Sequence, residues 1–251
     1  MIYPPFFDPL IEKRFVSLFE IKDLIVKYRS QVAVDGVSLK LEAGSSLGLI
    51  GANGAGKTST LKALLGLMKY QGNIEVFGQR PGNLKVFTRL GFAPEDADPP
   101  EYLTTQEYLR YVASLRIKDS TSRKHEVEES LKFFELDPKK AIRNCSKGQK
   151  RRVLIAQAML GNPDLLILDE PLNGLDPMFM IKLRERLIQY REKGKSIVYS
   201  SHILSEIEKS CTDLVILHKG KLLYSETVAK AAAEFGSVEN AFAKKVGEAG
   251  A

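Results

Sequence analysis

The sequence predicts an α/β fold in which a mainly parallel sheet carries an antiparallel β subdomain and an inserted α-helical subdomain. Three observations support this prediction. A glycine-rich loop at 51–58 stands between an apolar run and a helix-like segment, short alternating segments flank it, and a helical block at about 96–160 precedes a second apolar run. With 251 residues, 44% of them hydrophobic, the chain is long enough for one large domain.

Three short segments, 19–26, 36–41 and 72–78, alternate apolar and polar residues. This period of two is typical of half-buried strands, and we expect them to form an antiparallel edge sheet. Tyr28 lies between the first two segments. Its ring could stack on a nucleotide base, because stacking needs only a π-face, or Tyr28 could be an ordinary tyrosine at the end of a strand.

The glycine-rich loop reads Gly-Ala-Asn-Gly-Ala-Gly-Lys-Thr between the apolar run 46–50 and the helix-like segment 59–65. Backbone N–H groups of such a loop and the positive end of the following helix hold a phosphate group. Lys57 would reach the β- and γ-phosphates, and the Thr58 hydroxyl would bind Mg²⁺. The sequence therefore predicts the core of a P-loop nucleoside triphosphatase. Its expected nucleotide-binding residues here are Gly51, Asn53, Gly54, Ala55, Gly56, Lys57, Thr58 and Ser59.

Helical periodicity appears in three segments, 104–115, 127–134 and 147–160. The first begins with a Thr-Thr-Gln-Glu pattern at 104–107, which is typical of a helix start, and Asp137-Pro138 ends the second. Because this block lies between segments of strand character, we expect a helical subdomain inserted at about 96–160.

The run 165–168 is apolar throughout and is followed by Asp169 and Glu170, which predicts a central parallel strand with carboxylates at its ligand-binding end. Asp169 is the expected Mg²⁺ partner, and Glu170 is expected to orient or deprotonate a water. His202 follows the next strand, 196–200, and could hydrogen-bond the γ-phosphate. Taken alone, the acidic pair could be a solvated loop start and His202 an unremarkable loop residue.

The last third of the chain predicts a helix over 177–191 and a hairpin formed by 213–217 and 221–224 around Lys219-Gly220. We expect one domain over 18–225, an N-terminal extension over 1–17, and a short C-terminal tail over 226–251 with a short helix and a frayed end.

Composition excludes several classes of protein. The net charge of +6 is spread along the chain apart from a basic cluster at 147–152, so we expect no nucleic-acid partner. Cys145 and Cys211 have no metal-ligand spacing and predict no disulfide framework. The first residues lack the pattern of a signal peptide, and no run approaches 18 apolar residues, which predicts a cytosolic location.

The motifs stand in an order that resembles the nucleotide-binding subunit of ATP-binding cassette (ABC) transporters, over about 18–225. Besides the phosphate loop, the match includes Ser-x-Gly-Gln at 146–149, Asp-Glu-Pro at 169–171, Asn-Gly-Leu-Asp at 173–176 and His202. The resemblance implies these roles: Tyr28 as the adenine-stacking aromatic, 51–58 as the Walker A loop, Asp169 as the Walker B aspartate, Glu170 as the catalytic glutamate, 173–176 as the D-loop and His202 as the switch histidine.

Ser146, Gly148 and Gln149 resemble the family signature, which closes on the ATP held by a second subunit, so the resemblance implies a dimer. Cys145 and Lys147 depart from the usual Leu-Ser-Gly-Gly-Gln pattern. Lys147 either adds charge toward the γ-phosphate or points outward, and we favour the second.

The family's Q-loop position holds Glu95 in place of glutamine. A carboxylate can bind the metal but donates no hydrogen bond, so tighter Mg²⁺ binding and slower hydrolysis are both open.

The resemblance implies an ATPase that uses ATP and Mg²⁺, dimerises with an identical or a second cassette, and drives a membrane permease on a separate chain. Such a subunit is peripheral, on the cytoplasmic face of the membrane. The short C-terminus and the signature variant favour an exporter of drugs, antibiotics or polysaccharides. The alternatives are a non-transport ABC ATPase acting on DNA or ribosomes, a P-loop kinase or GTPase, and a cassette that binds ATP without turnover. The sequence leaves the substrate and the direction of transport open.

Overall fold

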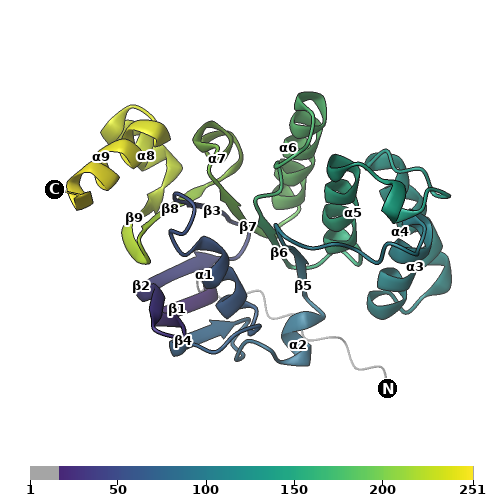
Figure 1. Cartoon of the computed structure of the whole chain (residues 1–251), viewed down its shortest axis with the longest axis horizontal. Helices are drawn as coiled ribbons and strands as arrows, with labels where there is room; N and C mark the ends of the chain where they lie inside the picture. The colour runs from purple at the N-terminus through teal and green to yellow at the C-terminus, as the bar shows by residue number, and fades with distance from the viewer. Residues whose placement is uncertain (1–16, 251) are drawn as a thin grey trace, which may run out of the picture.

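The computed structural model describes residues 17–250, which form two sheets with helices around them (Figure 1). The smaller sheet is antiparallel, as expected, with the order β2-β1-β4. Its strands are β1 (Ser17–Tyr28), β2 (Gln31–Glu42) and β4 (Gln71–Val76). The first two are longer than the alternating pattern indicated. Apart from Ser17, the expected extension 1–17 lies outside the described residues.

The larger sheet has the order β5-β6-β7-β3-β8-β9. Its first five strands are parallel, and β9 pairs antiparallel with β8 to give the expected hairpin. The strands are β3 (Ser46–Ile50), β5 (Leu90–Ala93), β6 (Leu165–Asp169), β7 (Ser196–Ser201), β8 (Asp213–His218) and β9 (Lys221–Thr227). The predicted α/β fold with a mainly parallel sheet and an antiparallel sheet is confirmed.

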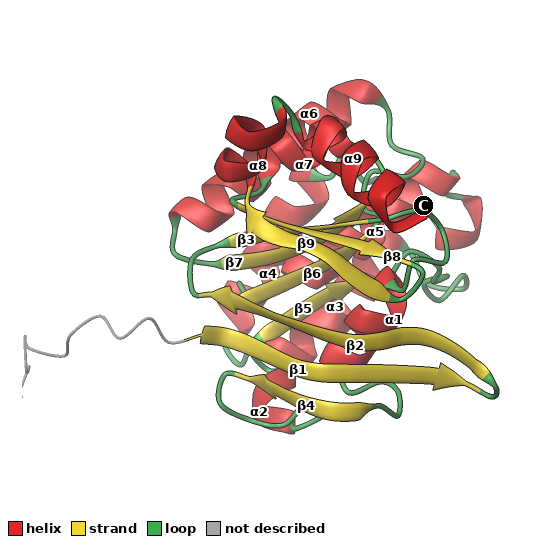
Figure 2. Cartoon of the chain, turned by 90° about the vertical axis from the view of Figure 1, so that its left-hand side faces the viewer, coloured by secondary structure: helices red, strands yellow, loops and turns green. Residues whose placement is uncertain are grey.

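The continuous apolar run of β6 is explained by the two hydrophobic cores that it separates. Leu165 and Ile167 point into the core between the two sheets, whereas Leu166 and Leu168 point into the core beneath the helices. Figure 2 shows the antiparallel sheet on one side of the larger sheet and α6–α9 on the other. A strand covered on both faces has no solvent-facing position, so alternation of polar residues disappears.

The helices predicted at 59–65, 104–115, 147–160 and 177–191 lie close to the expected places, the one predicted at 127–134 begins earlier, at Ser120, and the short helices at 84–87 and 204–210 were not predicted. The helices are α1 (Lys57–Leu64), α2 (Leu84–Phe87), α3 (Thr105–Arg116), α4 (Ser120–Phe133), α5 (Lys147–Met159), α6 (Pro177–Glu192), α7 (Leu204–Ser210), α8 (Val228–Phe235) and α9 (Val238–Gly250), with a 3₁₀ turn at Ile142–Asn144. A reciprocal capping box explains the start of α3: Glu107 N–H donates to Thr104 Oγ1, and Thr104 N–H donates to the Glu107 carboxylate.

The C-terminal segment differs from the prediction of one short helix and a frayed end. Two helices follow β9, and they bury Ala231, Val238 and Ala241 in the same core as the larger sheet. Gly236 ends α8 in the left-handed conformation, at φ 84°, so the chain turns back into α9. The high alanine content suggested a frayed tail, but small side chains are what allow these helices to pack closely.

Candidate functional site

The phosphate loop connects β3 to α1, and two of its glycines are required by close packing. Gly56 has φ 105°, and a Cβ atom there would lie 2.7 Å from Ala33 O. A Cβ atom on Gly51 would lie 2.5 Å from Leu217 O at the end of β8. The loop is therefore held against both β2 and the larger sheet, which fixes where its N–H groups point.

A cavity of about 570 Å³ opens over this loop. Its lining unites most of the predicted nucleotide-binding residues with residues from distant parts of the chain. The lining residues are Tyr28, Gln31, Val32, Ala33, Ala52, Asn53, Gly54, Ala55, Gly56, Lys57, Thr58, Ser59, Glu95 and Lys219. Its size and its backbone-rich floor suit the triphosphate of a nucleotide.

Lys57 and Glu170 form a buried ion pair below this cavity. Lys57 Nζ lies 3.3 Å from Glu170 Oε1 and donates a hydrogen bond to Gly51 O at 2.7 Å. Both charged side chains are less than 10% exposed. Burial makes such a charge costly unless it is paired, so each group holds the other in place.

Asp169 joins the larger sheet to the phosphate loop. Thr58 Oγ1 donates to Asp169 Oδ2 at 2.8 Å, and Ser200 Oγ donates to Asp169 Oδ1 at 2.5 Å. Asp169 is fully buried at the end of β6. Its carboxylate and the Thr58 hydroxyl supply adjacent hard oxygen atoms, which are the ligands that Mg²⁺ prefers. The residues present therefore fit this metal.

Glu170 is held in an uncommon backbone conformation, φ 49°, directly after β6. Its N–H donates to Ser200 Oγ at 2.9 Å, and its Oε2 lies 2.8 Å from His202 Nδ1. Among residues 17–250, no group donates a hydrogen bond to Glu170 Oε1, although the Lys57 ammonium is near it. A buried carboxylate oxygen with this free lone-pair capacity is suited to accept a proton from a water.

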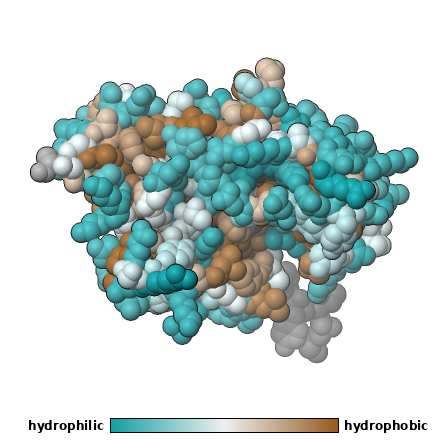
Figure 3. Space-filling model, viewed as in Figure 1, coloured by the Kyte–Doolittle hydropathy of each residue, from teal (hydrophilic) through white to brown (hydrophobic). Residues whose placement is uncertain are grey.

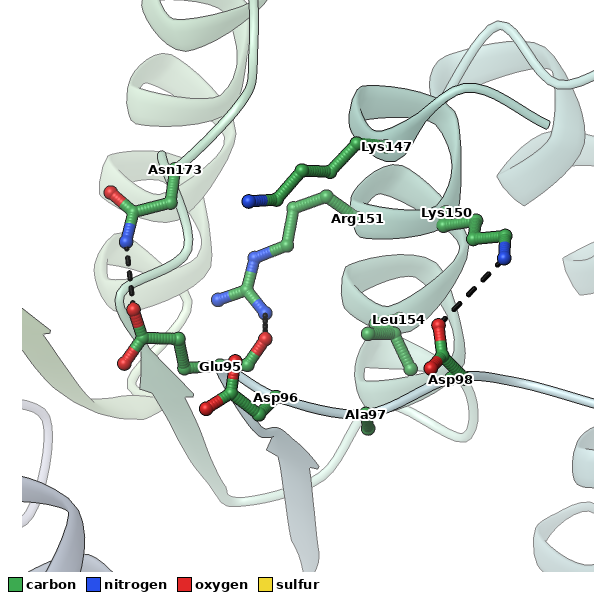
Figure 4. A pocket seen from close by; sticks show the side chains of 9 residues that line it. All are labelled: Glu95, Asp96, Ala97, Asp98, Lys147, Lys150, Arg151, Leu154 and Asn173. Atoms are coloured by element: carbon green, nitrogen blue, oxygen red, sulfur yellow. Dashed lines mark hydrogen bonds and ion pairs between the residues drawn. The ribbon is translucent and has the colours of Figure 1, made fainter.

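Tyr28 and Glu95 both line this cavity. Tyr28 is 48% exposed at the end of β1, and its hydroxyl accepts a hydrogen bond of 3.4 Å from Ser59 Oγ. The carboxylate of Glu95 accepts a hydrogen bond of 3.0 Å from Asn173 Nδ2. Glu95 also lines a second cavity, of about 350 Å³, between its own loop and α5 (Figure 4).

The residues of the Ser-x-Gly-Gln segment are not part of the phosphate-loop cavity. Ser146 is the N-cap of α5, and its N–H donates a hydrogen bond to the side-chain Oε1 of Gln149 at 3.1 Å. Gly148 packs against the D-loop segment, because a Cβ atom there would lie 2.6 Å from Gly174 O. Within the described residues, this helix start therefore faces no phosphate site of its own chain.

Sequence reasoning missed three residues that the fold brings to the site. Ser200 Oγ is hydrogen-bonded to both Asp169 and Glu170. Lys219 lines the phosphate-loop cavity, and Arg151 donates hydrogen bonds to carbonyl groups at the ends of β5 and β6. Lys219 stands in the Lys-Gly turn that the sequence predicted for the β8–β9 hairpin. Its place beside the phosphate loop depends on a tertiary contact, in which Gly220 N–H donates to Ala55 O at 3.1 Å. The buried serine and arginine carry no local signal.

Comparison with known families now identifies this arrangement. Residues 34–173, more than half of the chain, match the ABC transporter family. The chain belongs to the ABC transporter ATP-binding family. This confirms the resemblance seen in the sequence, and the chain therefore carries the fold and the nucleotide site of an ABC ATPase.

Named relatives agree with this assignment. The chain is 39% identical, over 77% of its length, to the uncharacterised ABC transporter ATP-binding protein all4389 of Nostoc, and 39% identical, over 82%, to the bacitracin transport ATP-binding protein BcrA of Bacillus licheniformis. These matches cover 59% and 69% of the two relatives. The chain thus spans less than two thirds of the Nostoc protein.

A solved structure, described as the ATP-binding subunit of an ABC transporter, superposes with a TM-score of 0.85 at 33% identity. The match covers 92% of this chain and all of that chain. Over residues 17–250 the ABC ATPase has no helix with the length and apolarity needed to cross a bilayer.

Proposed function

We propose that this chain binds and hydrolyses ATP and thereby energises export by a separate membrane-spanning partner. The observation that carries the proposal is the 2.8 Å hydrogen bond from Thr58 to Asp169, which joins the phosphate loop to the carboxylate end of β6. This bond brings the triphosphate cavity and two buried carboxylates into one site, as phosphoryl transfer to water requires.

In this proposal ATP occupies the cavity over the phosphate loop. Tyr28 stacks on the adenine ring, while the N–H groups of the phosphate loop and Lys57 hold the phosphates. Thr58 and Asp169 would hold Mg²⁺, and Glu95, which lines the cavity, could contribute a further oxygen ligand. The metal supplies charge neutralisation at the β- and γ-phosphates.

Hydrolysis uses Glu170 and His202. Because the γ-phosphate attracts the Lys57 ammonium, nucleotide binding weakens the Lys57–Glu170 ion pair and leaves Glu170 to act on water. The carboxylate takes a proton from the attacking water, the water oxygen bonds to the γ-phosphorus, and the bond to the β-phosphate oxygen breaks, giving ADP and phosphate. His202, 2.8 Å from Glu170 Oε2, orients the carboxylate and donates toward the γ-phosphate.

The signature segment supports a dimer as the working form. Ser146, Gly148 and Gln149 stand at the start of a thirteen-residue helix, whose N-terminal end favours an anion. Since they do not line the cavity of their own chain, the ATP they would contact belongs to a second cassette. Two cassettes related by a twofold axis would then enclose two ATP molecules.

We place the docking site of a membrane-spanning partner at the loop 96–100 and the neighbouring helical block. Figure 3 shows a mainly hydrophilic face interrupted by hydrophobic patches. A large apolar side chain is exposed directly after this loop, at Tyr102, and others are exposed on the helices that precede and follow it in the chain, at Leu84 on α2 and at Tyr111 and Leu115 on α3. A partner that docks here would place the ATPase at the cytoplasmic face of the membrane. The relative named for bacitracin transport favours export of an antibiotic-like substrate.

The decisive experiment measures ATP hydrolysis and ATP-dependent dimerisation of Glu170→Gln by phosphate release and size-exclusion chromatography. We expect hydrolysis to disappear and an ATP-dependent dimer to accumulate, because glutamine keeps the shape of glutamate but accepts no proton. Glu75→Gln, on the exposed face of β4, is the matched control and should behave as the unmodified chain. Full turnover by Glu170→Gln would refute its role as base.

The partner is tested by purifying a tagged chain from solubilised membranes and identifying the co-purifying proteins. A multi-span membrane protein in near-equal amount supports transport. Recovery of ribosomal or DNA-associated proteins in its place would contradict it.

A further inference from the structure

Arg151 is a buried cation whose hydrogen bonds go to backbone carbonyl groups. It lies on the first turns of α5 and is 5% exposed. Its Nε donates to Pro171 O at 3.3 Å and its Nη2 donates to Asp169 O. Its Nη1 donates to Pro94 O and, at 3.5 Å, to Glu95 O. Figure 4 shows the guanidinium pointing from α5 into the cavity beside Glu95.

These carbonyl groups belong to two neighbouring strand ends. Pro94 and Glu95 follow β5, whereas Asp169 and Pro171 stand at the end of β6 and just beyond it. The two strands pair in parallel, but their pairing ends at Ala93 and Leu168. Beyond that point Arg151 joins the backbone of the loop carrying Glu95 to the segment carrying Asp169 and Glu170, and the Asn173 side chain adds one hydrogen bond to the Glu95 carboxylate.

The chemistry of arginine makes this link stiff. A guanidinium presents its donors in a fixed planar fork and stays protonated, even though burial lowers its pKa here against the opposing effect of the Asp169 and Glu95 carboxylates. A displacement of the Glu95 loop would leave donors or carbonyl groups unpaired in a buried place, which is unfavourable because they would lose their partners without gaining water. Movement of one strand end is therefore passed to the other.

We propose that Arg151 is a positioning residue, which fixes the Glu95 loop relative to Asp169 and Glu170 and transmits displacement of that loop to them. The proposal rests on the function proposed above, in which these carboxylates bind Mg²⁺ and activate water. Within residues 17–250 the hydrogen bonds of Arg151 go to backbone carbonyl groups and none goes to the phosphate loop or Tyr28, so its effect on the site goes through the backbone of its partners.

The test compares Arg151→Gln with Arg116→Gln in the full-length chain. Arg116 is the control, because this partly buried arginine likewise donates to a backbone carbonyl, Leu160 O at 3.4 Å, just after the far end of α5. The measurements are kcat and KM for ATP, the Mg²⁺ concentration that gives half-maximal rate, and the thermal unfolding midpoint.

We expect Arg151→Gln to lower kcat about 10- to 100-fold and to raise the Mg²⁺ requirement, with the KM for ATP unchanged. Arg116→Gln should lower the unfolding midpoint and leave kcat and Mg²⁺ dependence as they were. Arg151→Lys keeps a buried cation with fewer fixed donors, so it should recover part of the rate. If Arg151→Gln does not fold, Arg151→Lys carries the same comparison.

Unaltered kcat and Mg²⁺ dependence in a folded Arg151 variant would overturn the proposal, as would a change confined to the unfolding midpoint. Failure of the proposed function, ATP hydrolysis, gives a different result. The unmodified chain would then hydrolyse no ATP, and this is measured first.

Discussion

Ser200 provides a direct test of how the carboxylate end of β6 is held together. Its hydroxyl donates to Asp169 Oδ1 at 2.5 Å and accepts from Glu170 N–H at 2.9 Å, and the side chain is fully buried. Ser200→Ala removes both bonds at once. Glu170 N–H keeps a second acceptor, Ser200 O at 3.2 Å, so the main loss is the hydrogen bond to the ionised carboxylate.

The expected loss of stability in Ser200→Ala follows from the hydrogen bond to the Asp169 carboxylate. A hydrogen bond to a charged group contributes about 1.5–3 kcal/mol to stability. For a chain of this size, each kcal/mol shifts the unfolding midpoint by about 2–4 °C, so we expect Ser200→Ala to melt roughly 3–12 °C lower. Because Asp169 and Glu170 also lose a positioning contact, kcat should fall about 10- to 100-fold.

Ser196→Ala is the matched control. Ser196 is equally buried at the other end of β7, and its hydroxyl accepts from Gly44 N–H at 2.8 Å, a neutral donor far from the carboxylates. Calorimetry and a phosphate-release assay on both variants separate general destabilisation from loss of the site. If Ser200→Ala keeps the kcat of Ser196→Ala, the hydroxyl does not position these carboxylates and our reasoning is refuted.

Two further predictions concern the cavity and the surface. Lys219→Ala should weaken ATP binding measured by calorimetry and leave adenosine binding unchanged, because Lys219 lines the phosphate-loop cavity and carries a positive charge. Lys221→Ala, whose side chain pairs with a surface aspartate, is the control, and equal ATP affinities in the two variants would contradict the prediction. Hydrogen bonds from Lys182 and, to a lesser extent, Arg152 lower the pKa of Glu135 in the folded chain. These ion pairs therefore stabilise the fold above the carboxyl pKa of the unfolded chain, about 4.3, and their contribution is lost as the pH falls through the lower pKa of the folded chain. The difference in unfolding midpoint between the unmodified chain and Glu135→Gln should therefore be present at pH 7 and shrink below about pH 4, whereas a difference that persists into acid would show that the charge is not its source.

Features with a local cause were predictable from the sequence. The order Gly-rich loop, Lys57 and Thr58 indicates a phosphate site because consecutive N–H groups and a helix start are close in the chain. The helix starting at Thr105 was visible through its capping box, and β6 through its unbroken apolar run. The motifs at 146–149 and 173–176 could also be found, since each is a short contiguous pattern.

Other features were decided by the tertiary structure. Sequence could not show that Gln149 would be used to cap α5, or that α8 and α9 would be buried against the larger sheet. Nor could it place Ser200 or Arg151 in the site, since their partners lie 18 to 57 residues away along the chain. Local patterns determine which segments become strands and helices and where a phosphate can bind. Which buried side chains hold the strand ends in register is decided by packing, because those contacts exist only after β5, β6 and β7 have come together.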